Sequence, residues 1–181
     1  MAPSTQRHQI GPERGSLILR TSRQGIAAPA GHDLTIEVGR WSGEVVLAED
    51  PAASTVSVTA DTGSLRVLDG SGGIAPLSER DKREIARTAR RLLDSDHHPE
   101  ARFTSTETTL KEPEHAVLEG SLALLGRDRP FRMEITHLGD GRYRGTGTVI
   151  QSEYGIKPYT AFFGALKLAD PVVVEAEVDL S

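Results

Sequence analysis

The sequence contains no cysteine among its 181 residues. This absence excludes disulfide bonds, thiolate metal ligands and a cysteine nucleophile, and it leaves the redox compartment open. No run of the chain approaches the ~18 consecutive apolar residues that a membrane-spanning helix requires. The opening residues, MAPSTQRHQIGPERG, lack the apolar core of a secretory signal. We therefore expect a cytoplasmic protein.

Strong charge of either sign is also missing. The net charge is −5, and there is no basic arm or acidic tail. Phosphate backbones are bound by clustered Lys and Arg, so this balance argues against nucleic acid as the main partner. The hydrophobic fraction of 37% and charged fraction of 26% are ordinary for a globular protein. We expect a mobile tail over residues 1–14 and a single domain over residues 15–181.

Alternating apolar and polar residues predict about eight or nine short strands, most with one apolar face. The predicted strands lie at residues 15–23, 32–38, 42–48, 54–61 with a continuation over 63–69, 102–108, 116–125, 130–137, 142–150 and 172–180. Short strands separated by turn signals are typical of an antiparallel sandwich or barrel. A barrel of about eight strands either fills with side chains or holds one small ligand.

One helix is predicted, over residues 78–94. Ser78 and Asp81 have the spacing of a capping box, and Pro99 prevents the helix from continuing. Its apolar face must lie on the sheet. That face consists of Ile85, Ala89, Leu92 and Leu93.

No spacing of residues predicts catalysis, a metal or a cofactor. The six histidines form no H-x-H pair and no H-E-x-x-H motif. No G-x-S-x-G elbow marks a nucleophile. His97 and His98 follow the predicted helix, where the dipole favours a partly cationic imidazole. We therefore assign no catalytic residue and no metal ligand, and we expect a protein that is not an enzyme.

The few aromatic residues are unevenly distributed. The chain has one Trp, three Tyr and four Phe, and Tyr154, Tyr159, Phe162 and Phe163 all fall in one irregular apolar segment. Buried aromatic rings dominate packing energy, so this segment needs a partner surface. It is either a plug that closes one end of a barrel or the lip of an apolar pocket, and the two are compatible.

Two further features have a structural and a functional interpretation. Gly145 and Gly147 interrupt a predicted strand, which indicates a bend or, less often, room for a ligand. Arg83, Arg87 and Arg91 lie in the second half of the helix. They form a solvated face favoured by the helix dipole, or they meet an anionic head group.

The order of short sequence motifs along the chain resembles that of the YceI-like family of lipocalin-like, polyisoprenoid-binding proteins. Gly120 lies in a segment similar to the family's "V-x-G-x-L" strand motif, and Pro99 lies in one similar to its "P-x-x-x-F-x-S" motif. The similar segments are residues 65–69, 78–82, 93–105, 118–122, 129–131, 152–156 and 172–180. Gln151 and Tyr154 stand where the family often has Arg and Phe.

The resemblance implies an antiparallel lipocalin-like barrel of about eight strands with one inserted helix and an elongated apolar interior. The implied function is binding or transport of a long isoprenoid chain, such as a polyprenyl phosphate or a quinone, and the implied assembly is a homodimer. The candidate lining residues are Phe103, Leu122, Leu124, Phe131, Met133, Ile135, Ile150, Tyr154, Tyr159, Phe162 and Phe163. The head-group candidates are Arg83, Arg87 and Arg91. The alternative is a filled barrel that serves as an interaction or stress-response module without a ligand.

Overall fold

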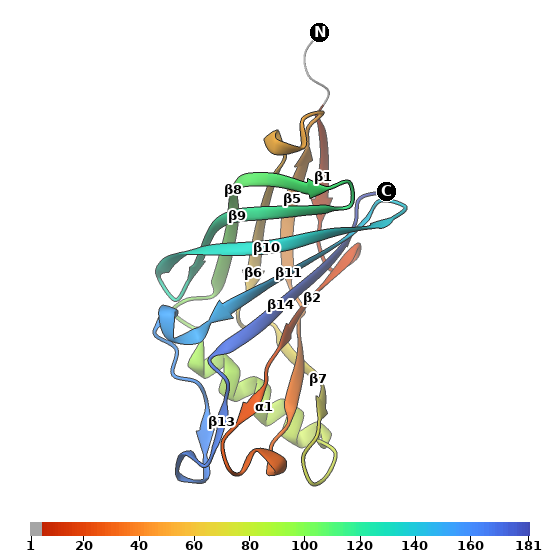
Figure 1. Ribbon diagram of the computed structural model, residues 1–181. Helices are drawn as coiled ribbons and strands as arrows, with labels where there is room; N and C mark the ends of the chain where they lie inside the picture. The colour runs from red at the N-terminus through yellow and green to blue at the C-terminus, as the bar shows by residue number, and fades with distance from the viewer. Residues whose placement is uncertain (1–4) are drawn as a thin grey trace.

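The computed structural model describes residues 5–181, and within them eleven strands form one antiparallel sheet that curls around a central space (Figure 1). Its strand order is β1-β5-β6-β8-β9-β10-β11-β14-β2-β4-β7. These strands are β1 (Gln6–Ile10), β2 (Gly15–Arg20), β4 (Asp33–Val38), β5 (Trp41–Leu47), β6 (Thr55–Asp61), β7 (Leu65–Ser71), β8 (Glu100–Glu112), β9 (His115–Leu124), β10 (Arg127–Gly139), β11 (Arg142–Ile150) and β14 (Pro171–Asp179). The prediction of a mainly β, antiparallel, lipocalin-like barrel is confirmed.

Smaller elements complete the described residues. A second sheet joins β12 (Thr160–Ala161), β13 (Leu166–Leu168) and β3 (Arg23–Gln24). Four short 3₁₀ helices are η1 (Ala28–Ala30), η2 (Pro51–Ala53), η3 (Gln151–Tyr154) and η4 (Phe162–Gly164).

The sheet has eleven strands where about eight or nine were predicted, because β1 was not predicted and because a kink separates β7 from β6. Gly39 and Arg40 separate β4 from β5, and residues 62–64 separate β6 from β7. β14 pairs with β2, β2 with β4, and β5 with β6. Following β4 through its kink into β5 therefore leads from one side of the sheet round to the other, which encloses the interior.

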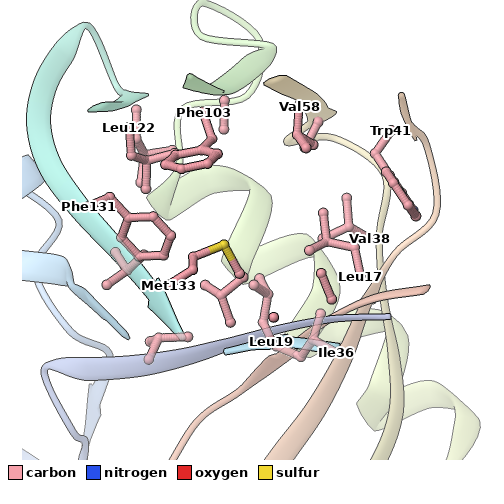
Figure 2. Close-up of a pocket in the computed structure, with 18 of the residues that line it drawn as sticks. Leu17, Leu19, Ile36, Val38, Trp41, Val58, Phe103, Leu122, Phe131 and Met133 are labelled. Carbon is pink, nitrogen blue, oxygen red and sulfur yellow. The ribbon is translucent and has the colours of Figure 1, made fainter. Parts of the chain in front are cut away.

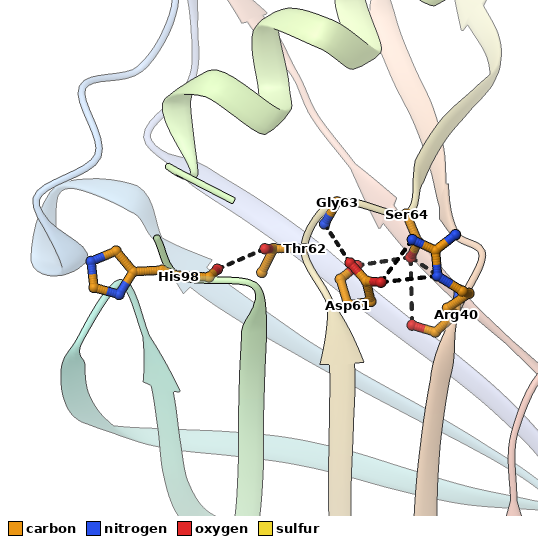
Figure 3. A network of polar contacts seen from close by, with 6 residues as sticks. All are labelled: Arg40, Asp61, Thr62, Gly63, Ser64 and His98. Atoms are coloured by element: carbon orange, nitrogen blue, oxygen red, sulfur yellow. Dashed lines mark hydrogen bonds and ion pairs between the residues drawn. The ribbon is translucent and has the colours of Figure 1, made fainter. Parts of the chain in front are cut away.

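A polar network holds the two kinks together (Figure 3). The Asp61 carboxylate accepts a hydrogen bond from Arg40 Nε at 2.9 Å and one from the Gly63 amide at 2.7 Å. The Ser64 hydroxyl accepts from the Arg40 amide at 2.9 Å. The Arg40 hydrogen bond holds the pKa of Asp61 below its ordinary value. A charge-assisted contact of this kind favours the bent geometry over a straight strand.

The kink is also tied to the chain that follows the helix. Thr62 is buried, and its hydroxyl donates to the carbonyl of His98 at 2.8 Å. Its amide donates to the carbonyl of Pro99 at 2.9 Å. These bonds fix the loop between the helix and β8 against the sheet.

The expectation of a mobile tail over residues 1–14 is wrong for the part that the structure describes. Gln6–Ile10 forms β1, which pairs with β5 from Gln6 opposite Leu47 to Ile10 opposite Gly43. Ile10 is buried in the core. A strand with a single inward apolar anchor gives almost no periodic signal, so sequence patterning misses it. Residues 1–4 lie outside the described residues.

The predicted helix is confirmed as α1 (Glu79–Leu92), the only α-helix within residues 5–181. Ser78 is its N-cap: the hydroxyl accepts from the Asp81 amide at 3.2 Å, and the Asp81 carboxylate accepts from the Ser78 amide at 2.9 Å. The helix packs against β7 and crosses the lower part of the barrel (Figure 1). It thereby covers one side of the interior with Ile85, Ala89 and Leu92.

Candidate functional site

The inward-facing side chains enclose a cavity of about 990 Å³. This volume lies at the upper end of the range for small-molecule sites, roughly 300–1,000 Å³. In Figure 2 the side chains of Leu122 and Phe131 lie on one side of the space, and Val38 and Trp41 lie on the other. Strands β2, β4, β6, β8, β9 and β10 all contribute to the lining, so the cavity runs through the centre of the barrel.

Small inward residues explain why the interior stays hollow. Ala60, Ala101, Ala116 and Ala176 all line the cavity. Side chains alternate between the two faces of a strand, so each small inward residue leaves its share of the interior empty. The small size of these inward residues therefore keeps the barrel hollow. Almost all of the interior is apolar.

Eight of the eleven predicted lining residues do line this cavity. Most come from β8, β9 and β10, where strict alternation fixes which residues face inward. They are Phe103, Leu122, Leu124, Phe131, Met133, Ile135, Tyr159 and Phe162. The segment of residues 154–164 thus supplies part of a pocket lip, as one of its two interpretations stated.

Three predicted lining residues lie elsewhere. Ile150 is at the end of β11, and its neighbour Val149 faces the cavity instead. Tyr154, the last residue of η3, is only 3% exposed and packs in the core, where burial raises the pKa of its phenol. Phe163 is fully exposed at the tip of η4. Ile150 was wrongly predicted because the assumed alternation was off by one residue at the end of its strand. The positions of Tyr154 and Phe163 depend on loop geometry, which strand alternation does not describe.

The head-group candidates on the helix do not reach the cavity. Arg83, Arg87 and Arg91 are exposed and contribute nothing to its lining, and Arg87 instead pairs with Glu84 at 3.0 Å. They lie on the helix face away from Ile85 and Ala89, because two residues along a helix turn about 200°. These arginines form a solvated face.

The cations that do line the cavity come from the small sheet. Arg23 on β3 and Lys167 on β13 occupy neighbouring strands, with Lys167 opposite Gln24 and Leu168 opposite Arg23. The Arg23 guanidinium donates to the carbonyls of Gly31 and Ser71. Its Nε lies 3.9 Å from Asp33 Oδ1. The pairing of β3 with β13 joins segments about 140 residues apart, so sequence reasoning missed this pair.

The first half of the chain also lines the cavity and was not named among the candidates. The lining includes Leu17, Leu19, Ile36, Val38, Trp41, Val45, Val56 and Val58. The alternation of Leu17 and Leu19 was visible in the sequence. It was sufficient to place them inside, since the inward face of every barrel strand meets the same interior.

The two strand glycines have a role that neither sequence interpretation gave. A β-carbon at Gly147 would lie 2.6 Å from the Phe131 ring, and one at Gly145 would lie 2.9 Å from Met133 Cε. The β10–β11 register is regular through both positions. The glycines therefore make room for side chains of the adjacent strand, so the predicted bend is wrong, and neither a kink nor a ligand explains them.

Titratable groups within residues 5–181 form no cluster of three that would hold a metal ion. The Asp94 carboxylate lies 2.7 Å from His97 Nδ1, and this hydrogen bond raises the pKa of His97. The pair is exposed and follows the helix. Neither residue lines the cavity.

A sequence profile of the YceI-like domain matches residues 18–180. The chain belongs to the YceI-like family. No helix among residues 5–181 of this YceI-like chain is long and apolar enough to cross a membrane. No functionally curated protein matches the sequence significantly.

Solved structures share the fold of this YceI-like chain. BcnA from Burkholderia cenocepacia superposes with a TM-score of 0.64 and 14% identity, over 91% of this chain and 94% of that chain. The YceI protein of Campylobacter jejuni gives 0.60 and 14%, over 79% and 81%. A polyisoprenoid binding domain from Saccharophagus degradans gives 0.55 and 10%, over 98% and 100%. Identities this low establish a common fold.

Proposed function

We propose that this protein binds a long apolar ligand of the polyisoprenoid class inside its barrel and does not transform it. The observation that carries the proposal is the apolar cavity of about 990 Å³. The similarity in fold to a polyisoprenoid binding domain supports the same class of ligand. Filling the cavity with a prenyl chain removes apolar surface from water, at roughly 0.8 kcal/mol per CH₂.

The lining suits a flexible branched chain. Phe103 and Phe131 offer ring faces and edges, and Met133 beside them adapts its shape because its thioether side chain is unbranched. The buried hydroxyl of Thr21 accepts from the Leu34 amide at 3.2 Å, so it does not require a polar partner from the ligand. Shape and apolar burial therefore select the tail.

We infer that the head group of the ligand lies at the end of the cavity that Arg23 and Lys167 line. Two cations on neighbouring strands suit a phosphate better than an uncharged quinone ring, because charge-assisted hydrogen bonds to phosphate are strong. Within the class, we therefore favour a polyprenyl phosphate. Arg23 and Lys167 replace the helix arginines as head-group residues in this proposal.

The filled-barrel alternative predicts an interior without room for a ligand. The cavity of about 990 Å³ favours ligand binding over that alternative. A homodimer and a cytoplasmic location remain predictions of the proposal. Sedimentation velocity and fractionation of the native cell test these two points separately from ligand binding.

The test is native mass spectrometry of the gently purified protein, followed by solvent extraction and lipid analysis. We expect an adduct whose mass matches a prenyl lipid and which leaves on extraction. Apo protein is then titrated with a polyprenyl phosphate and, as a matched control, with a straight-chain phosphate of similar length. A clean apo mass together with no uptake of either lipid would refute the proposal.

A further inference from the structure

Exposed apolar side chains gather at one end of the molecule. Residues 5–181 contain seven large hydrophobic residues that are strongly exposed, and five of them belong to three loops at this end. The five are Ile26 (92% exposed), Ile74 (88%), Tyr159 (44%), Phe162 (63%) and Phe163 (113%). An exposed apolar group of this size marks an interaction surface.

The three loops, residues 25–31, 71–77 and 157–165, form one unit that we call the loop end. The Ala27 amide donates to the carbonyl of Ala165 at 3.0 Å, which joins the first loop to the third. The ring of His32, the residue after the first loop, lies 2.8 Å from the carbonyl of Ala75 in the second loop, which joins these two loops. In Figure 1 all three loops lie at the lower end, beside β13, the start of β4 and the end of β7.

The backbone of η4 holds the Phe163 ring outward. Phe162 and Phe163 have φ angles of 51° and 55°, and Gly164 follows with 85°. Consecutive left-handed residues are uncommon for bulky side chains, so this turn is not the default conformation of the sequence. It turns Phe163 into solvent, whereas collapse onto the barrel would bury the ring.

The cavity reaches the surface at this end. Tyr159 and Phe162 both line the cavity and remain exposed to solvent. Gly31 at the end of the first loop and Leu166 and Leu168 on β13 also line the cavity. The apolar loop end is therefore continuous with the apolar interior.

The three loops of the loop end contain no carboxylate, and Asp33, whose Oδ1 lies 3.9 Å from Arg23 Nε, lies just beyond the first of them. The protein has 26 Asp and Glu residues, yet none lies in residues 22–32, 71–77 or 155–169. The charged residues of these segments are Arg23, Lys157 and Lys167. Apolar side chains flanked by cations, without carboxylates, are the pattern that binds an anionic lipid surface.

The cavity lining is also exposed near the β8–β9 hairpin, where the charged residues differ from those of the loop end. Leu110, 51% exposed, lines the cavity near the β8–β9 hairpin, at the opposite end from β13 (Figure 1). Glu107, Glu112 and Glu114 surround it in the sequence. Carboxylates at this position repel an anionic bilayer, so the two ends are not equivalent.

We propose that the loop end inserts Ile26, Phe162 and Phe163 into the headgroup region of an anionic bilayer, where the ligand enters and leaves the barrel. The docking on the bilayer follows from the exposed apolar side chains of the loop end and from the absence of carboxylates in its loops. Its role in ligand exchange rests on the proposed function, since a prenyl lipid resides in the membrane from which it is loaded.

The test is co-sedimentation of the full chain with vesicles of equal parts phosphatidylcholine and phosphatidylglycerol, compared with vesicles of phosphatidylcholine alone. We expect binding to the anionic vesicles that falls with added salt. The variant Phe162→Ser/Phe163→Ser should weaken the partition by about tenfold or more. Lys157→Glu/Lys167→Glu should weaken it by about tenfold or more as well.

Leu110→Ser/Lys111→Glu is the matched control, because it makes the same kinds of change in the β8–β9 hairpin. We expect it to bind as the unmodified protein does. Thermal unfolding of all variants establishes that they fold; Phe163 is fully exposed, so its replacement removes no packing. Absence of binding to anionic vesicles, or equal losses in the control and the loop-end variants, would overturn the proposal.

The remaining outcomes separate the two proposals. Protein that carries or takes up a prenyl lipid but ignores vesicles refutes the docking alone. Protein that binds vesicles through Phe162 and Phe163 but never takes up a lipid refutes the proposed function alone. A dimer that dissociates in Phe162→Ser/Phe163→Ser, without vesicle binding, assigns the surface to a second copy and overturns the docking.

Discussion

The ring of Phe103 on β8 packs edge-to-face against the ring of Phe131 on β10, with centroids 5.7 Å apart and planes at 78°. Both rings are buried, and both border the cavity. β9 lies between their strands, with Leu122 opposite Phe103 and Gly120 opposite Phe131. Gly120 leaves room for the Phe103 ring, since a β-carbon there would lie 2.6 Å from Phe103 Cε2.

This aromatic contact should be measurable as a coupling between the two residues. We expect Phe103→Leu and Phe131→Leu each to destabilise the protein, and the double variant to lose less than the sum. An edge-to-face pair contributes about 0.5–1.5 kcal/mol beyond burial. Urea unfolding of the four proteins of the cycle measures the coupling. Strictly additive losses would show that the rings act only through the area they bury.

Filling the cavity should abolish ligand uptake without unfolding the barrel. Val58 lines the cavity, whereas its neighbour Ser57 on β6 is exposed. Val58→Trp places an indole in the empty interior, so we expect several-fold less co-purified or added prenyl lipid. Ser57→Trp, the matched control, places the same side chain outside and should bind normally. Equal uptake by both variants would place the ligand outside the barrel.

The N-cap of α1 should carry a measurable share of stability. Ser78→Ala removes the acceptor of the Asp81 amide, and loss of an N-cap hydroxyl costs about 1 kcal/mol. Ser78→Thr keeps the hydroxyl and should restore most of the loss. Urea unfolding followed by circular dichroism makes the comparison. If the alanine and threonine variants unfold alike, side-chain packing and not capping fixes the start of the helix.

Acid should remove the contribution of Asp61 at the strand kink. Its pKa in the folded protein is lowered from the ordinary 3.8, chiefly by the hydrogen bond from Arg40. A lowered pKa means that the stabilisation is complete above the unfolded value and disappears as the pH falls through the folded value. Asp61→Asn should therefore destabilise the protein at pH 7 and approach the unmodified protein below about pH 4.

The size of the Asp61 effect should be modest, because an exposed ion pair contributes about 0.2–1 kcal/mol. Urea unfolding at several pH values measures it. Asp128→Asn, at the exposed start of β10, is the control for loss of a carboxylate away from the kink. A difference between Asp61→Asn and the unmodified protein that stays constant with pH would show that charge is not the cause.

Much of the cavity could be predicted because strand alternation is a local property. On β10 the alternation of Phe131, Met133 and Ile135 with polar neighbours was enough to place all three inside. The start of α1 was predictable for the same reason, since Ser78 and Asp81 are three residues apart. The prediction for Ile150 was wrong because Ile150 ends its strand, where a shift of one residue decides which face a side chain occupies.

The sequence by itself therefore determined the antiparallel barrel class, the capped helix and most inward positions, because each depends on residues within a few places of one another. Only the tertiary structure decided that Ile10 belongs to a strand and that β4 continues into β5 across a kink. It also decided that the cations facing the interior are Arg23 and Lys167 and not the helix arginines. These depend on pairing between distant segments, of β1 with β5 and of β3 with β13, which no local pattern encodes.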